Sequence, residues 1–236
     1  MTLSVAFSIF EEPRVERTAP APRFPFAIFD MDGTLIDTST LILASYSYAI
    51  AGSLSKQLNA SDILSLSGRT LRDALAKSVP SDQIELASDR YHEYFARRFA
   101  RRTRTYPGVR KLLTSLRQAD VMLGVFTGAS RKSAQTALEL SGLDLFFHSI
   151  VTADDVNQSK PDPEGLQKAM DQLGAADDET IYVGDDPDDI VASRRAGVTG
   201  AGALWGSRKR EELEALNPDF LFNYPSDVEA LVTGPL

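Results

Sequence analysis

The chain has 236 residues, 43% of them hydrophobic, and a formal net charge of −8 at pH 7. Its length suffices for one large core, or for a core with a smaller inserted unit. The absence of cysteine excludes disulfides, thiolate metal sites and cysteine nucleophiles. The acidic balance argues against general nucleic-acid binding.

No stretch of the sequence is long and apolar enough to span a bilayer. The first residues lack a basic region and soon reach Glu11 and Glu12, which is unlike a secretory signal. We therefore expect a cytoplasmic protein without a membrane partner. The pattern does not distinguish a monomer from a dimer.

In chain order, residues 1–24 are interpreted as an N-terminal extension that is rich in proline. Phe26–Phe29 has the length and composition of a buried strand, and Gly33 ends it. From 40 to 103 the apolar spacing is helical throughout, which predicts a helical module. Its apolar faces are carried by Leu41–Ile50, then by Leu71, Ala74 and Leu75, and then by Tyr91, Phe95 and Phe99.

Strand and helix patterns alternate after Tyr106-Pro107-Gly108. Such alternation predicts an α/β fold with a parallel sheet, built from residues 25–39 and 104–236 around the helical insertion at 40–103. Asp162 and Pro163 fit the cap and first position of one of its helices. Strands are expected at 121–126, 149–152, 181–183, 200–204 and 220–222, and helices at 109–116, 131–140, 163–173 and 190–196.

Carboxylates gather where the predicted strands end. Asp30 and Asp32 follow the first strand, and Asp185 and Asp186 follow a later one. In parallel sheets ligands bind beyond the carboxyl ends of the strands. Converging carboxylates are costly to bury unless a cation lies between them. Mg²⁺, which prefers oxygen ligands, fits this set together with a phosphate and waters.

Other residues at these ends suit an anion. Thr127 supplies a hydroxyl, and the N–H groups of Gly128 and Ala129 are expected to open a helix, which would make an anion site. Lys160, in a loop, adds positive charge where a phosphoryl group would develop negative charge. A nucleophile, an acid/base, a metal and an anion clamp together favour phosphoryl transfer through an aspartyl-phosphate.

Four segments, in this order, resemble the motifs of the haloacid dehalogenase-like hydrolase superfamily. They are Asp30-Met31-Asp32-Gly33-Thr34, Thr127, Lys160 and Gly184-Asp185-Asp186-Pro187-Asp188-Asp189. The chain is most similar to the phosphoglycolate phosphatase-like branch with a helical cap. This resemblance implies a Rossmann-like parallel sheet flanked by helices, with 40–103 as an all-helical cap that closes over the site.

The resemblance also implies a role for each motif residue. Asp30 attacks phosphorus, and Asp32 protonates the leaving alcohol and then activates water. Mg²⁺ is held by the Asp30 carboxylate, the Asp32 carbonyl and Asp185. The phosphate is bound by Gly33, Thr127, Gly128 and Lys160.

The resemblance defines the roles of two aspartates in the fourth motif less closely. Asp189 is expected to position Lys160 or a metal-bound water. Asp186 stands where many relatives carry serine, so a direct contact of Asp186 with the metal is left open.

The cap contains ten basic and six acidic residues between Thr40 and Arg104, over an acidic body. In Gly68-Arg69-Thr70, Arg69 could bind a substrate carboxylate or second phosphate, or be a surface arginine near a helix start. The run from Arg97 to Arg104 is interpreted as a solvated face, with steering of anionic substrates as the alternative.

These observations predict a Mg²⁺-dependent phosphoric monoester hydrolase acting on a small phosphorylated metabolite, such as a phosphoglycolate-like or sugar phosphate. One alternative is a phosphomutase of the β-phosphoglucomutase type, which returns the phosphoryl group to a sugar. Another, from a different class, is a catalytically idle binding or regulatory protein on the same scaffold.

Overall fold

The computed structural model describes residues 21–51 and 70–234. In this part of the chain, a parallel six-stranded sheet has the strand order β5-β4-β1-β6-β7-β8. The predicted α/β class is confirmed. The strands are β1 (Phe26–Phe29), β4 (Met122–Phe126), β5 (Ser149–Val151), β6 (Thr180–Gly184), β7 (Thr199–Ala203) and β8 (Phe220–Phe222).

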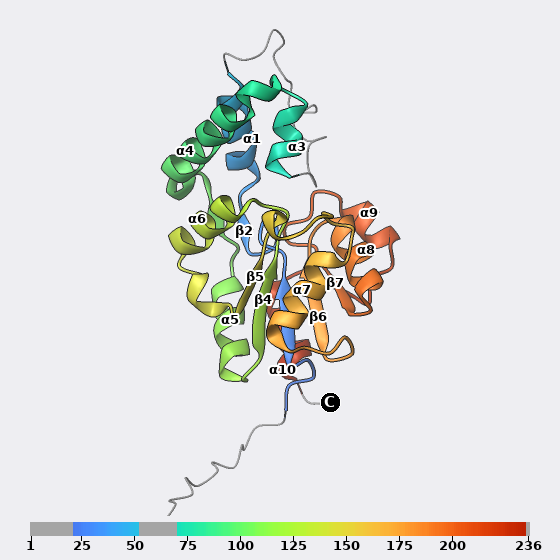
Figure 1. Ribbon diagram of the computed structural model, residues 1–236. Helices are drawn as coiled ribbons and strands as arrows, with labels where there is room; N and C mark the ends of the chain where they lie inside the picture. Colours follow the sequence, from blue (N-terminus) through green and yellow to red (C-terminus); the bar gives the residue numbers. More distant parts are fainter. Residues whose placement is uncertain (1–20, 52–69, 235–236) are drawn as a thin grey trace, which may run out of the picture.

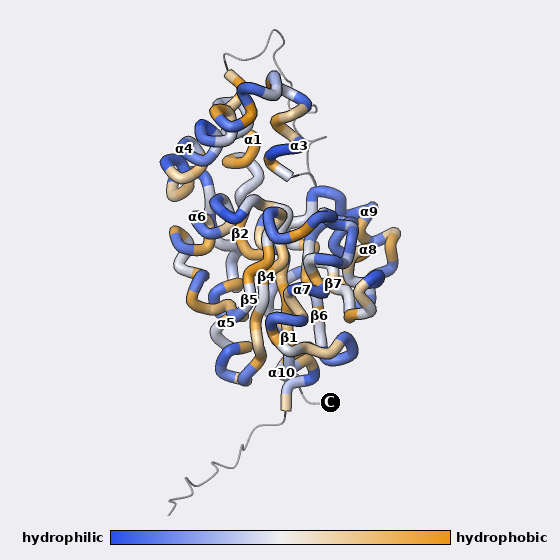
Figure 2. The backbone as a smooth tube through the Cα atoms, viewed as in Figure 1, coloured by the Kyte–Doolittle hydropathy of each residue, from blue (hydrophilic) through white to orange (hydrophobic). Residues whose placement is uncertain are grey.

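Helices cover both faces of the sheet (Figure 1) because successive residues of a strand face opposite sides. In β1, Ala27 and Phe29 belong to one hydrophobic cluster and Ile28 to the other. Figure 2 shows the hydrophobic strands enclosed by helices of mixed polarity. The helices of the core are α5 (Val109–Gln118), α6 (Arg131–Ser141), α7 (Glu164–Leu173), α8 (Pro187–Ala196), α9 (Arg210–Ala215) and α10 (Pro225–Thr233).

A helical lobe, the cap, lies at one end of the sheet (Figure 1) and consists of α1 (Ser39–Ile50), α3 (Leu71–Ala76), η1 (Ser81–Gln83) and α4 (Ile84–Arg102). The predicted buried face of α4 is confirmed, since Tyr91, Phe95 and Phe99 are all buried. The chain passes between core and cap twice. At this junction β2 (Ile36–Asp37) pairs antiparallel with β3 (Arg104–Thr105).

Several details differ from the sequence prediction. Helix α7 begins at Glu164, one residue late, although the Asp162 carboxylate does accept a hydrogen bond from the Glu164 N–H at 3.0 Å. Helices α9 and α10 were not predicted. Residues 1–20 of the predicted extension lie outside the described residues, but Phe24 is buried against the core. Among the helices of the described ranges, none is long and apolar enough to cross a bilayer.

The packing of α7 on the sheet yields a test. A Cβ at Gly165 would lie 2.1 Å from the ring of Phe126, which is itself buried. Gly165→Ala should therefore lower the free energy of unfolding by about 1–3 kcal/mol, although alanine normally stabilises a helix relative to glycine. In urea unfolding, Phe126→Leu should rescue part of this loss. Equal losses with and without Phe126→Leu would contradict the proposed clash.

Candidate active site

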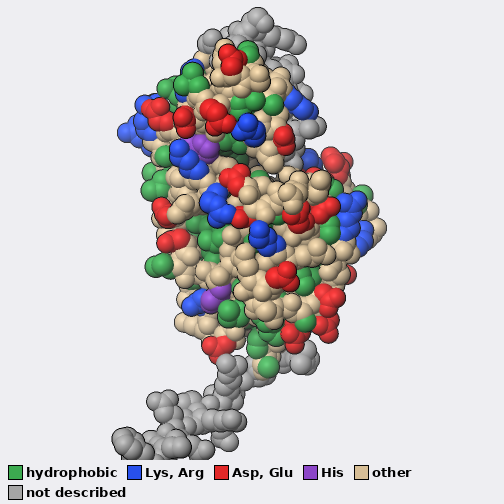
Figure 3. All heavy atoms as spheres, in the orientation of Figure 1, with side chains coloured by type: hydrophobic (Ala, Val, Ile, Leu, Met, Phe, Trp, Pro, Cys, Tyr) green, Lys and Arg blue, Asp and Glu red, His purple; other side chains and the backbone are tan. Residues whose placement is uncertain are grey.

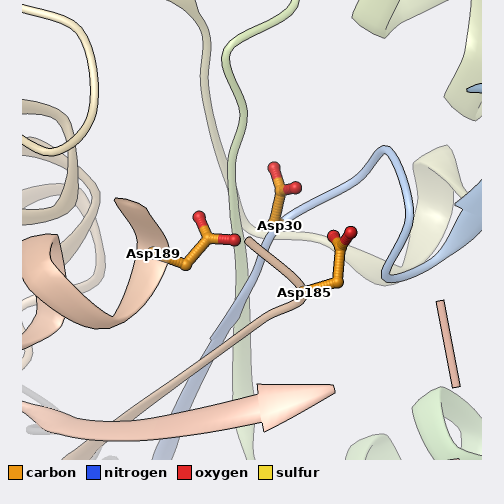
Figure 4. Close-up of side chains that lie close together, drawn as sticks. All are labelled: Asp30, Asp185 and Asp189. Atoms are coloured by element: carbon orange, nitrogen blue, oxygen red, sulfur yellow. The ribbon is translucent and has the colours of Figure 1, made fainter. Parts of the chain in front are cut away.

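The sheet order brings the chemically distinctive strand ends together. β1 lies between β4 and β6, so Asp30, Thr127 and Asp185 leave the sheet from adjacent strands. Lys160 comes from the segment between β5 and α7. Figure 4 shows the carboxylates of Asp30, Asp185 and Asp189 gathered around one space. The sequence pattern predicted that carboxylates from different strand ends converge here, but not which of them contact one another.

Lys160 links two buried carboxylates. Its Nζ lies 2.8 Å from Asp30 Oδ1 and 2.7 Å from Asp189 Oδ1. Burial raises the pKa of Asp30 to about 7, because the charges of Asp189 and Asp32 add to desolvation and outweigh the attraction of Lys160. Burial alone would lower the pKa of Lys160, but Asp189 and Asp30 raise it, so its ammonium stays charged.

Asp189 is held from several sides. The Tyr182 hydroxyl donates to Asp189 Oδ1 at 2.9 Å, and the Asp186 N–H donates to Oδ2 at 3.0 Å. Tyr182 and Asp189 are both fully buried. These contacts fix the Asp189 carboxylate against Lys160, one of the two roles expected for it.

Asp32 faces the same cavity and receives a short hydrogen bond from the Thr38 hydroxyl. Thr38 is fully buried just before α1, so this bond restricts the Asp32 side chain. Burial raises the pKa of Asp32. A carboxyl with a raised pKa and a fixed orientation holds its proton more tightly than an ordinary aspartate and is suited to transfer it.

A tight turn places Asp185. Gly33 has a φ of +89°, and a Cβ there would lie 2.3 Å from Asp185 Oδ2, so both its backbone and its neighbour require glycine. The Thr34 hydroxyl donates to Asp185 Oδ1 at 3.0 Å. The Trp205 indole N–H donates to the Thr34 carbonyl at 2.9 Å, which anchors the loop after β7 on this turn.

The Asp186 carboxylate forms its contacts outside the cluster of Asp30, Asp185 and Asp189. Its Oδ1 accepts from the Asp188 N–H at 3.1 Å at the start of α8, and its Oδ2 lies 2.8 Å from Lys209 Nζ. It is not among the grouped carboxylates. The metal contact that the sequence left open for Asp186 therefore has no support in this geometry.

The Thr127 segment is arranged differently from the prediction. Helix α6 begins at Arg131 with Ser130 as its cap, so Gly128 and Ala129 form a turn before it. The Ala129 N–H donates to the Thr127 hydroxyl at 3.1 Å. Thr127 and Gly128 line the cavity together with Ser130 and Ser133, so both the turn and the start of α6 face it.

One cavity of about 460 Å³ connects these groups with the cap. Its floor is polar and contains the aspartates, Thr127 and Lys160, with Arg208 and Lys209 at the side. Its roof, from the described part of the cap, is apolar and aromatic. The roof residues are Ile42, Leu43, Tyr46, Leu71, Tyr91 and Phe95. Figure 3 shows acidic and basic side chains at the level where cap and core meet.

The cluster of aspartate carboxylates is suited to bind a divalent cation. Oxygens of Asp30, Asp185 and Asp189 lie within 4.8 Å of one another. Burial, with the charges of Asp30 and Asp189, raises the pKa of Asp185 well above its ordinary value. Lys160 pairs with the other two, whereas Asp185 receives a neutral Thr34 hydroxyl. The unbalanced negative charge and the all-oxygen donor set suit Mg²⁺.

Sequence reasoning missed several contributors and named one that cannot be placed. Arg69 lies outside the described residues. Thr38, Arg208 and Lys209 were not identified, because their places in the cavity depend on how the chain folds around it. Tyr182 could have been found, since a tyrosine in a buried strand needs a partner for its hydroxyl.

Known proteins are similar to this chain in sequence and in the fold that forms this site. The model of the haloacid dehalogenase-like hydrolase family matches residues 27–203. The chain belongs to this family. It is 34% identical over 212 residues to the pyrophosphatase PpaX of Bacillus cereus strain G9842, which covers 90% of this chain and 98% of that protein. The PpaX of Bacillus mycoides strain KBAB4 is 34% identical over 201 residues, covering 85% and 93%.

Solved structures support the same fold. A predicted phosphoglycolate phosphatase from Haemophilus somnus 129PT has a TM-score of 0.77 at 22% identity, covering 87% of this chain and 96% of that one. A hydrolase from Pseudomonas syringae has a TM-score of 0.74 at 29% identity, covering 86% and 94%. The chain is thus a haloacid dehalogenase-like hydrolase with a helical cap, and it is similar in sequence to the PpaX proteins of Bacillus.

The raised pKa of Asp30 predicts how a metal should bind. Mg²⁺ must displace the proton that Asp30 holds below about pH 7, and the raised pKa of Asp185 adds to this competition, so Mg²⁺ affinity should fall at least about tenfold per pH unit between pH 7 and pH 5. Calorimetric titration at several pH values would measure this. Asp171→Asn, on the exposed side of α7, is the matched control and should not alter it. A Mg²⁺ affinity independent of pH from 5 to 8 would contradict the shift.

The raised pKa of Asp30 makes Mg²⁺ affinity increase with pH, but it makes the stability of the metal-free fold decrease with pH. Asp30 holds its proton more tightly in the folded metal-free protein than at its ordinary pKa of 3.8. Its contribution to the free energy of unfolding therefore declines as the pH rises from about 4 to about 7. The rise in melting temperature on adding Mg²⁺ should accordingly be larger at pH 8 than at pH 6.

Proposed function

We propose that this phosphatase hydrolyses a small phosphomonoester through an aspartyl-phosphate on Asp30. The observation that carries the proposal is the pairing of two differently held aspartates in one cavity. Asp30 lies against Lys160 in the buried charge cluster, and Asp32 is bound to Thr38 at the edge. Different surroundings for neighbouring carboxyls support different roles for them.

In this proposal the Asp30 carboxylate attacks phosphorus, and the bond from phosphorus to the leaving oxygen breaks. Asp32 gives its proton to that oxygen, so an alcohol departs. Asp32 then accepts a proton from the water that attacks the phosphoryl group on Asp30, which releases phosphate and restores both residues. Lys160, held by Asp189, keeps a positive charge beside the transferring oxygens.

Mg²⁺, held by the carboxylates of Asp30 and Asp185 and by the Asp32 carbonyl, would offset negative charge on Asp30 and the phosphate. Asp189 is already bound to Lys160 and Tyr182, so we assign it to positioning Lys160.

The shape of the cavity supports a substrate with an organic body. The six apolar or aromatic roof residues would leave a purely anionic substrate without matching contacts on that side. An alcohol also gains more than a phosphate from a proton donor such as Asp32, because an alkoxide is a poor leaving group. Arg69 remains the expected partner of a carboxylate on such a substrate.

Pyrophosphate is the second candidate. The PpaX relatives support it, and so do Arg208 and Lys209, which could face a departing phosphate at the side of the cavity. A β-phosphoglucomutase-type activity remains the alternative for a sugar 1-phosphate. A binding protein without catalysis is the alternative of another class.

A phosphate-release screen with Mg²⁺ separates these candidates. The panel should contain 2-phosphoglycolate, several sugar phosphates, p-nitrophenyl phosphate and pyrophosphate. The proposal expects a monoester to have the highest kcat/KM, and a pyrophosphate preference of tenfold or more would replace it. Isomer formation from a sugar 1-phosphate without net phosphate release would favour the mutase. In the same screen, Arg69→Ala should selectively lose carboxylated substrates.

The two aspartates should respond differently to amide substitution. Asp30→Asn should abolish turnover. Asp32→Asn should still transfer a phosphoryl group from p-nitrophenyl phosphate, because nitrophenolate leaves without protonation, but its second step should slow by about 10²–10⁴-fold.

Rapid quenching should therefore show a burst of nitrophenolate in Asp32→Asn, and mass spectrometry should find a phosphorylated peptide containing Asp30. Asp171→Asn should behave like the parent protein. Unchanged activity in Asp30→Asn would exclude the proposed nucleophile.

A further inference from the structure

A second cavity lies where the cap joins the core and has a volume of about 510 Å³. We call it the arginine cavity. It shares no lining residue with the active-site cavity. Its lining consists of Thr40, Arg98, Arg101, Arg102, Thr103 and Arg104.

The four arginines lack the acidic partners that several other surface arginines have. Arg72 pairs with Glu85 at 2.7 Å, and Arg97 pairs with Glu93 at 3.5 Å. Across the described ranges, the guanidinium groups of the arginine cavity form neither ion pairs nor hydrogen bonds with the protein, although that of Arg98 lies over the Tyr94 ring at 5.7 Å from its centroid. The Nε of Arg98 is buried and has no hydrogen-bond partner. A buried donor without a partner is uncommon and calls for an explanation.

The end of α4 explains only part of this cluster. Arg101 and Arg102 lie in its last turn, where basic residues interact favourably with the helix dipole. Arg98 lies one turn earlier on the same face, and Arg104 lies beyond the helix in β3. The Phe99 carbonyl, moreover, already accepts hydrogen bonds from the Thr103 N–H and hydroxyl at 3.0 and 2.8 Å.

Four positive charges around one hollow repel one another unless an anion is present. Guanidinium groups bind phosphate through paired hydrogen bonds, and several of them can share a chain of phosphates. We propose that the arginine cavity binds a small anion with two or more linked phosphate groups, as inorganic oligophosphates and nucleotides have.

The location gives such binding a consequence. Thr40 lies in the first turn of α1, and Arg104 lies where the chain returns to the core. The Thr40 hydroxyl donates to the Arg102 carbonyl at 3.3 Å, so the two connections between cap and core are already in contact here. An anion bound by Arg98, Arg101 and Arg104 would link the end of the cap helix to β3 and restrict movement at this junction.

Calorimetric titration of the full-length protein in EDTA tests the site with tripolyphosphate, ATP and orthophosphate as probes. Tripolyphosphate should bind at least tenfold more tightly than orthophosphate, and less tightly as salt increases. Equal affinities for tripolyphosphate and ATP would mean that the phosphate chain alone is recognised. Tighter binding of ATP would mean that a nucleotide is the ligand.

Substitutions locate the binding. Arg98→Gln with Arg101→Gln should weaken tripolyphosphate binding about a hundredfold, or about tenfold per arginine. Arg97→Gln, on the same helix but outside the cavity, is the matched control and should stay within about twofold. The exposed Arg101→Gln alone, with an unchanged circular dichroism spectrum, guards against a folding defect and should still lose about tenfold.

Lys160→Met separates this site from the active site. Tripolyphosphate binding that persists in Lys160→Met and disappears in the arginine variants supports the proposal. Binding lost in Lys160→Met but kept in the arginine variants would assign the anion to the active site and overturn it. Failure of the parent protein to bind tripolyphosphate at low salt would also overturn it. None of these outcomes depends on which phosphate compound the enzyme hydrolyses.

Discussion

The carboxylates of three aspartates lie together at the carboxyl end of this sheet, and the ammonium group of Lys160 pairs with two of them. Asp30 and Asp189 contact Lys160 directly, while Asp185 receives only a neutral hydroxyl. Burial makes this excess of negative charge expensive, and the metal-free protein relieves it by raising the pKa of Asp30 and Asp185. A divalent cation would relieve it differently, by keeping both groups charged. The cluster is thus held in a state that favours binding a cation and a phosphate together.

The backbone around the cluster allows little adjustment. A Cβ at Gly206 would lie 1.7 Å from the Gly33 carbonyl, so the loop after β7 packs directly on the turn that follows Asp32. The Trp205 indole binds the same turn, and Tyr182 fixes Asp189 from below. Such close contacts keep the carboxylates of the candidate site in place without relying on a bound ligand.

The cap and the core contribute different kinds of surface to the active-site cavity. The core contributes charge at its floor, while the described cap contributes apolar and aromatic surface at its roof. Under the proposed function, the charged floor would act on the transferring group and the apolar roof would contact the rest of the substrate. The arginine cavity lies on the connections between these two parts, and shares residues with neither surface.

The sequence alone determined the α/β class, the helical insertion and the strand-end positions of Asp30, Thr127 and Asp185. These follow from local features, namely apolar periodicity and polar residues placed directly after buried runs. The four motifs likewise identified the family from short segments.

Only the tertiary structure decided which of these groups touch. The strand order places β1 between β4 and β6, and this order is a non-local property that periodicity does not encode. It brings Lys160 to Asp189 and commits Asp186 to Lys209. The Thr38 bond to Asp32 spans only six residues, yet it depends on the turn at Gly33 that brings the two side chains together. Contacts between distant segments depend on the packing of the whole chain, and for that reason the sequence pattern could not predict them.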